Sequence, residues 1–260
     1  MTLLLEAVDA RGVATLTLNR PDRHNAFDDA LIAALNDSLA RLAADPKVRV
    51  VVLASTGGSF SAGADLGWMK RMASQSQAEN EADAALMAAM LHALDRLPKP
   101  TIALVQGSAY GGGVGLVACC DIAIGTPAAR FCLSEVKLGL TPATISPYVI
   151  AAIGPRQARR LFMTAEVFSA ETAQSIGLLH QVVPEAELAA TGEGVVASLL
   201  RNAPGAVAAA KELVFLAEGR PVDAPLSAET SRRIAERRAS EEGREGIAAF
   251  LEKRKAPWFV

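Results

Sequence analysis

Two glycine-bearing turns hold the residue types that could stabilise a developing negative charge. The first, FSAGADL at 60–66, follows the apolar run VRVVVL at 48–53, and the second, QGSAYGGG at 106–113, follows TIALV at 101–105. Each turn leads from a strand-like run into a helical one, and a helix N-terminus carries unpaired N–H groups and partial positive charge. Glycine lets another group approach the backbone closely. Neighbouring turns of this kind would aim two N–H donors at one oxygen, although such turns also occur as plain connections.

A carboxylate, Glu135, follows the short apolar run at 130–133. Partial burial there would raise its pKa and make it a usable base near neutral pH. The alternative is a turn carboxylate paired with Lys137 or a nearby arginine. A phosphate-binding turn is a poorer interpretation of the glycines, because the chain has neither GxxxxGK[ST] nor a clean GxGxxG after its first strand.

The elements that would position these groups can be read from periodicity. Leu31, Leu35, Leu39 and Leu42 recur at helical spacing and predict a helix over about 28–44. The run at 48–53 predicts a strand buried on both faces, and 55–63 reads as a loop. Beyond about 144 the strand signal nearly vanishes. We therefore expect an α/β core over 1–200 and a C-terminal helical region over 201–260.

Composition narrows the class of protein. The formal net charge is −2 with no obvious basic face, which argues against a nucleic-acid partner. The three cysteines have no zinc spacing, so we expect buried thiols and no metal site. The apolar stretches are too short to span a bilayer and the N-terminus lacks the pattern of a signal peptide, so the expected location is cytoplasmic, away from membranes.

The motifs together resemble the enoyl-CoA hydratase/isomerase, or crotonase, family. In that family's order they are NRPxxxNAF at 19–27, FSAGADL, QGxAxGGG, CDIAI at 120–124, FxLSExxLGLxP at 131–142 and a helical tail ending FLEKRKAPW at 250–258. Each motif is weak alone, and their conjunction covers nearly the whole chain. Within the family, FSAGADLGWM, CCDIAIG and FCLSEVKLGLTPATISP are most similar to bacterial 3-methylglutaconyl-CoA hydratases and related carboxylated enoyl-CoA hydratases.

The resemblance implies a spiral of ββα units with a C-terminal helical trimerisation region, assembled as a homotrimer or a hexamer. It implies an acyl-CoA thioester as the substrate and no separate cofactor. It assigns catalytic roles to Glu135 and to the N–H groups of Ala64 and Gly112. The residues implied in CoA binding are Arg23, His24, Ala26, Ala62, Asp65 and Leu66. Those implied in binding the acyl part are Trp68, Gly111, Gly115, Leu140 and Pro142.

One departure from the family pattern bears on the reaction. Hydratases of the family use two glutamates, and the second falls at Gly115 here, with no carboxylate beside it. We expect hydration with Glu135 as the single proton carrier, and a substrate carboxylate is one candidate to fill the space at Gly115. The alternatives are isomerisation of a 3-enoyl-CoA to a 2-enoyl-CoA, for which one base suffices, and a non-catalytic acyl-CoA-binding protein.

Overall fold

Two β-sheets form the frame of the computed structural model, which describes residues 2–259. The larger sheet holds, in spatial order, β1 (Leu4–Val8), β2 (Val13–Leu18), β3 (Val50–Ser55), β5 (Thr101–Val105), β7 (Ile122–Gly125) and β10 (Gln181–Val182). The smaller sheet holds β4 (Ser59–Ser61), β6 (Ser108–Tyr110), β8 (Arg130–Cys132) and β9 (Phe168–Ser169). The pairs β1–β2 and β8–β9 are antiparallel, and the other pairs are parallel.

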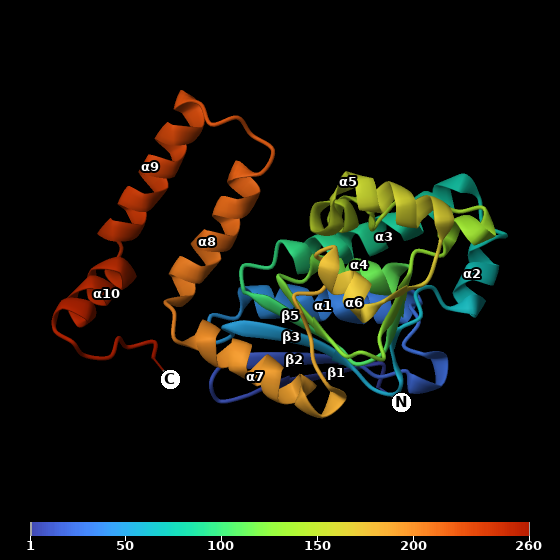
Figure 1. Cartoon of the computed structure of the whole chain (residues 1–260), viewed down its shortest axis with the longest axis horizontal. Coiled ribbons are helices and arrows are strands. Elements are labelled where there is room, and N and C mark those ends of the chain that lie inside the picture. The colour runs from blue at the N-terminus through green and yellow to red at the C-terminus, as the bar shows by residue number, and fades with distance from the viewer. Residues whose placement is uncertain (1, 260) are drawn as a thin grey trace.

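The chain alternates between the two sheets and returns through helices (Figure 1). Strands β3, β5 and β7 of the larger sheet are each followed by a short strand of the smaller sheet and then by helix. The helices over this part are α1 (Asp29–Ala44), α2 (Leu66–Met72), α3 (Gln77–Asp95), α4 (Gly112–Cys119), α5 (Ser146–Thr164), α6 (Ala170–Ser175) and α7 (Glu185–Leu200). Two 3₁₀ turns lie among them, η1 (Pro21–Arg23) and η2 (Glu135–Leu138). The predicted spiral of ββα units is confirmed.

Helix α1 shows how the sequence pattern becomes packing. The Asp28 side chain caps it by accepting the N–H of Leu31. The leucines that predicted this helix, at 31, 35, 39 and 42, are all buried. Burying each stabilises the fold by about 1.5–3 kcal/mol relative to leaving it exposed. This apolar face joins the main core between the sheets and α1, α3, α4 and α5.

A second core covers the opposite face of the larger sheet. There α7 packs Leu188, Val196 and Leu200 against Val50 and Ile102 of β3 and β5. Strand β3 is thus buried on both faces, as its continuous apolar run predicts. No helix within residues 2–259 combines the length and apolar character needed to cross a membrane.

The last helices stand away from the two sheets (Figure 1). They are α8 (Pro204–Ala217), α9 (Ala224–Ala239) and α10 (Glu241–Leu251). An ion pair of 2.8 Å joins Lys211 of α8 to Asp121 at the start of β7. Large apolar side chains remain exposed along this helical region, at Val214, Val222, Ile234, Ile247, Phe250 and Leu251.

Four strands depart from the sequence expectation, among them β9, which lies where no strand is predicted. The segment at 55–63, expected as a loop, contains β4, and the second glycine turn contains β6. Strand β1 was not predicted. Strands β4 and β6 have three residues each, too few to show an alternating pattern. Their pairing with each other is what places the two glycine turns side by side.

Candidate active site

The two glycine turns touch each other. Strands β4 and β6 are parallel neighbours, with Ser59 opposite Ser108. Gly63 has φ of +83°, and a Cβ built on it would lie 2.8 Å from the carbonyl oxygen of Tyr110 and 3.6 Å from the nitrogen of Gly112. Glycine is therefore required at 63 both by the backbone conformation and by the close approach.

Two backbone N–H groups remain free in this contact. Phe27 donates to Gly63 O at 2.7 Å, and Asp65 donates to Phe27 O at 2.7 Å, so the N–H of Ala64 between them points the other way. Gly112 is the first residue of α4, where N–H groups have no helical acceptor. Within residues 2–259, neither Ala64 nor Gly112 donates a backbone hydrogen bond. Two unpaired N–H groups on touching turns are what an oxyanion hole requires.

Glu135 lies beside these donors. Its Oε1 atom is 3.0 Å from the position that a Cβ of Gly111 would take, one residue before the donor at Gly112. Its Oε2 atom is buried without a hydrogen-bond partner within the described part of the chain, and burial raises the pKa of the carboxyl group. Lys137 forms no ion pair with it among residues 2–259. A carboxyl group with a raised pKa therefore lies beside two backbone N–H groups that have no acceptor within residues 2–259.

The residues predicted to bind CoA come together on two adjacent segments, 20–27 and 60–66. The N–H of Ala62 donates to His24 O at 2.9 Å, which ties the segments together. The Arg23 and His24 side chains are exposed, and Leu66 is 80% exposed next to the donor turn. Ala26, by contrast, is buried, its N–H donates to Arg23 O and its carbonyl oxygen accepts from Arg20, so little of it is open to a ligand.

Asp65 has a structural task in this cluster. Its carboxylate caps α2 by accepting the N–H groups of Gly67 and Trp68 at 2.8 and 3.2 Å. It also pairs with Arg20 at 3.3 Å. Burial alone would raise the pKa of Asp65, but the two N–H bonds and the arginine charges outweigh it and the pKa is lowered. This carboxylate holds the Ala64 turn in place through its own helix.

The residues predicted to contact the acyl part divide into two groups. Gly111 lies against Glu135, and Leu140 is exposed just after η2. Pro142 is buried. Trp68 is only 5% exposed and packs in the main core, so little of its surface can face a substrate.

Gly115 leaves no room for a substrate carboxylate, so the expectation of a ligand group in that space is wrong. A Cβ on Gly115 would lie 2.3 Å from Ile145 Cγ2 and 2.9 Å from Ile145 Cβ. Ile145 is 1% exposed and directly precedes α5. The volume that the missing glutamate opens is filled by this side chain.

Two residues that support the site were missed by sequence reasoning. Asn25 is fully buried and donates to the carbonyl oxygens of Thr56 and Ser59, while its Oδ1 accepts the N–H of Arg20. The Arg20 guanidinium reaches the Ala26 carbonyl and the Asp65 carboxylate. Both residues belong to the motif at 19–27, which is the signal that could have found them.

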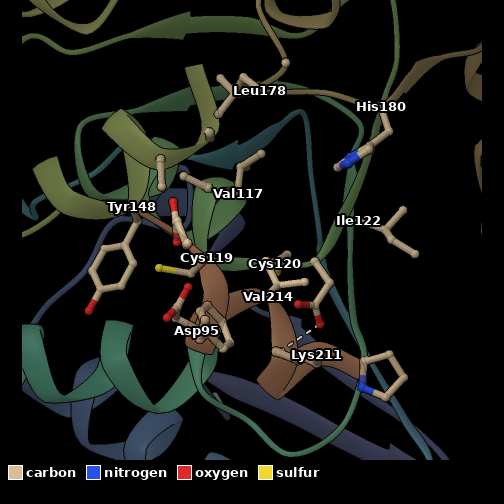
Figure 2. A pocket seen from close by; sticks show the side chains of 18 of the residues that line it. Asp95, Val117, Cys119, Cys120, Ile122, Tyr148, Leu178, His180, Lys211 and Val214 are labelled. Atoms are coloured by element: carbon tan, nitrogen blue, oxygen red, sulfur yellow. Dashed lines mark hydrogen bonds and ion pairs between the residues drawn. The ribbon is translucent and has the colours of Figure 1, made fainter. Parts of the chain in front are cut away.

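A cavity of about 650 Å³ lies elsewhere, between the core and α8 (Figure 2). Cys119 at the end of α4, Asp95, Tyr148 and Lys211 line it, and none of the predicted catalytic or CoA-binding residues does. All three cysteines are buried free thiols, and burial raises the pKa of Cys120 to about 12. Among residues 2–259 no three His, Cys, Asp or Glu side chains gather closely enough to hold a metal ion.

The fold brings two unpaired backbone N–H groups beside one carboxyl group, the groups that an enzyme would need to stabilise an oxyanion and to move a proton. The family model described as "Enoyl-CoA hydratase/isomerase" matches residues 9–259. The chain therefore belongs to the enoyl-CoA hydratase/isomerase family.

Named relatives agree with this assignment. The short-chain-enoyl-CoA hydratase of Clostridium acetobutylicum is 33% identical over 95% of this chain and 94% of its own length. The crotonyl-CoA hydratase of Syntrophomonas wolfei is 32% identical over 94% of this chain and 93% of its own. The crystal structure of an enoyl-CoA hydratase from Shewanella pealeana superposes with a TM-score of 0.96 at 44% identity, covering 99% of this chain and 96% of that one.

Proposed function

We propose that this chain adds water across the C2=C3 double bond of an enoyl-CoA thioester. One observation carries the proposal: the Glu135 carboxyl group, whose buried Oε2 has no hydrogen-bond partner among residues 2–259, lies next to the N–H groups of Ala64 and Gly112, which lack acceptors in the same range. The names of the relatives support hydration as the reaction of this site.

In the proposed reaction, the thioester oxygen accepts the N–H groups of Ala64 and Gly112. Glu135 takes a proton from water as the water oxygen bonds to C3, and the C2=C3 electrons move to the thioester oxygen to form an enolate. Glu135 then returns the proton to C2, and the enolate collapses to the saturated 3-hydroxyacyl thioester. Each N–H donor contributes about 3 kcal/mol of stabilisation to the enolate-like transition state. The positioned carboxyl contributes a factor of about 10² to 10⁴.

For the acyl group, we propose a branched or carboxylated chain such as 3-methylglutaconyl, which would place the enzyme in leucine breakdown; straight chains would place it in fatty-acid metabolism. The support is the similarity of the segments around Trp68, Cys120 and Glu135 to hydratases of that substrate. Because Ile145 fills the space at Gly115, a substrate carboxylate would have to lie elsewhere.

A second candidate reaction follows from the single carboxyl group. One base can move a proton from C2 to C4 of a 3-enoyl-CoA, so isomerisation needs nothing beyond Glu135 and the two N–H donors. The hydratase names of the relatives place it second.

The test is a paired assay of 3-methylglutaconyl-CoA and crotonyl-CoA, repeated with Glu135→Gln. Hydration of either substrate that is lost in the variant supports the proposal, and the faster substrate identifies the acyl class. Conversion of a 3-enoyl-CoA without any hydration would move the assignment to isomerase. Binding without turnover of any of these esters would contradict both reactions.

We further propose a homotrimer or a dimer of trimers in the cytoplasm, with no cofactor beyond the CoA carried by the substrate. The exposed apolar residues of α8–α10, Phe250 and Val222 among them, support assembly. Light scattering on the purified protein would read the mass directly. Turnover should survive dialysis against a metal chelator, because the two N–H groups supply the stabilisation of the oxyanion.

A further inference from the structure

Two glycines one helical turn apart frame the start of α4. The N–H of Gly115 donates to Gly111 O at 3.3 Å, so the two residues are i and i+4 neighbours at the helix entrance. A Cβ on Gly111 would meet the Glu135 carboxylate, and a Cβ on Gly115 would meet Ile145. Glu135 and Ile145 therefore occupy successive positions along the same turn of α4.

The Ile145 side chain cannot easily give way. It is β-branched and stiff about χ1, and the colliding atoms are its Cγ2 and Cβ rather than a flexible end. It is almost fully buried, and Leu91 Cδ2 closes the same space from α3 at 3.5 Å from the position of a Cβ on Gly115. Any side chain at 115 would have to displace a packed core residue.

We propose that Ile145 is a positioning residue matched to Gly115: it seals the side of Glu135 on which a second acid or a second water would act, so that one carboxyl group carries out both proton transfers. The catalytic role of Ile145 rests on the proposed function, whereas the packing of Ile145 against Gly115 does not depend on it. Because Ile145 occupies this space, a single substitution of Gly115 by glutamate would not place a second acid beside Glu135.

Glu135 has few charged neighbours whose own titration would complicate a pH profile of its carboxyl group. Burial raises the pKa of the Cys132 thiol on β8, which donates to Ala165 O, and the charge of the Glu135 carboxylate adds to that rise. Lys137 of the same turn lowers the thiol pKa, and its own side chain is exposed. Burial is the main cause of the raised pKa of Glu135, so admitting water is expected to change its titration more than any nearby charge does.

The first experiment is a cycle of melting temperatures with Gly115→Glu, Ile145→Gly and the double variant. Each single change should lower Tm, the first by collision and the second by leaving a cavity. The double variant should lose much less Tm than the sum of the two single losses, because the new side chain enters the vacated space. Additive losses, or a Gly115→Glu protein that melts like the parent, would overturn the matched pair.

The melting temperatures do not depend on enzymatic activity, so they test the packing of Ile145 against Gly115 even if the proposed function is wrong. In the catalytic arm, the double variant should hydrate enoyl-CoA at least tenfold faster than Ile145→Gly alone, since a second acid contributes a factor of about 10² to 10⁴ when well placed. Equal rates in these two variants would refute the claim that Ile145 holds the place of an acid.

The milder variant Ile145→Ala tests the sealing of Glu135. Water admitted beside the carboxyl should lower its pKa, so the acidic limb of the kcat/KM profile should move to lower pH. The matched control is Ile153→Ala, which empties a buried site two turns further along α5. A limb that stays in place in Ile145→Ala, or that shifts equally in Ile153→Ala, would show that Ile145 is ordinary core.

Discussion

Replacing Gly63 with alanine should damage catalysis far more than stability. The new methyl group would lie 2.8 Å from the carbonyl oxygen of Tyr110, and the backbone at φ of +83° is disfavoured for alanine. The φ strain costs about 1–2 kcal/mol. The collision has to be relieved by moving the two turns apart, which displaces the N–H of Ala64 from that of Gly112.

Loss of one aligned donor costs about 3 kcal/mol in the barrier, which corresponds to a roughly 100-fold lower kcat. KM should change little, because the enolate charge exists only in the transition state. The assay is steady-state hydration of crotonyl-CoA together with thermal melting, with Glu135 left intact.

The matched control is Gly219→Ala in the loop between α8 and α9. Gly219 has a similar φ of +67°, and nothing lies within 4 Å of its Cβ position, so only the strain remains. Gly63→Ala should lose more Tm than Gly219→Ala because the collision adds to the strain, and only the variant at Gly63 should lose kcat. If the two variants keep the same kcat, the contact between the turns does not align the donors and the reasoning is wrong.

Further predictions concern charge. Glu135→Gln should raise Tm at pH 8 and leave it unchanged at pH 4, because a folded-state pKa above the ordinary value means that stability is lost as the pH rises through it; an equal shift at both pH values would contradict this. Asp65→Ala should cost about 1–2 kcal/mol at pH 7 in denaturant titrations. Because the pKa of Asp65 is lowered, that cost should shrink as the pH falls below the ordinary range of aspartate. Arg23→Ala should raise KM with little change in kcat, and the difference from the parent should fade at high salt, since its exposed guanidinium would meet the CoA phosphates.

The longer helices and strands were predictable because their apolar patterns extend over many residues. The helix at 28–44 has four apolar repeats and a capping aspartate, and the strand at 101–105 has the bounds that its apolar run predicts. Strands β4 and β6 escaped prediction because their stability comes from pairing with each other across some fifty residues, and three-residue runs show no period of their own.

In the candidate site, too, features with a local sequence signal could be predicted and features that depend on distant contacts could not. Glu135 and the glycine turns could be found from residue type, because an acid after an apolar strand and glycines before a helix are local signals. The filling of Gly115 by Ile145 could not, since it depends on a contact across thirty residues between a glycine and an apolar side chain that look ordinary alone. Asn25 was missed because its hydrogen bonds lead to another segment of the chain.

The two proposed donors at Ala64 and Gly112 are main-chain atoms, and this has a consequence for how the site can change. Every residue except proline supplies the same N–H group, and proline would also constrain the backbone of the turn, so side-chain substitutions reach these donors only through the conformation of the turns. Side chains around them can vary and reshape the acyl pocket while the donors persist. A direct test alters the backbone itself, by an ester link in place of the amide of Ala64, which substitutes an oxygen atom for the N–H group and leaves every side chain in place.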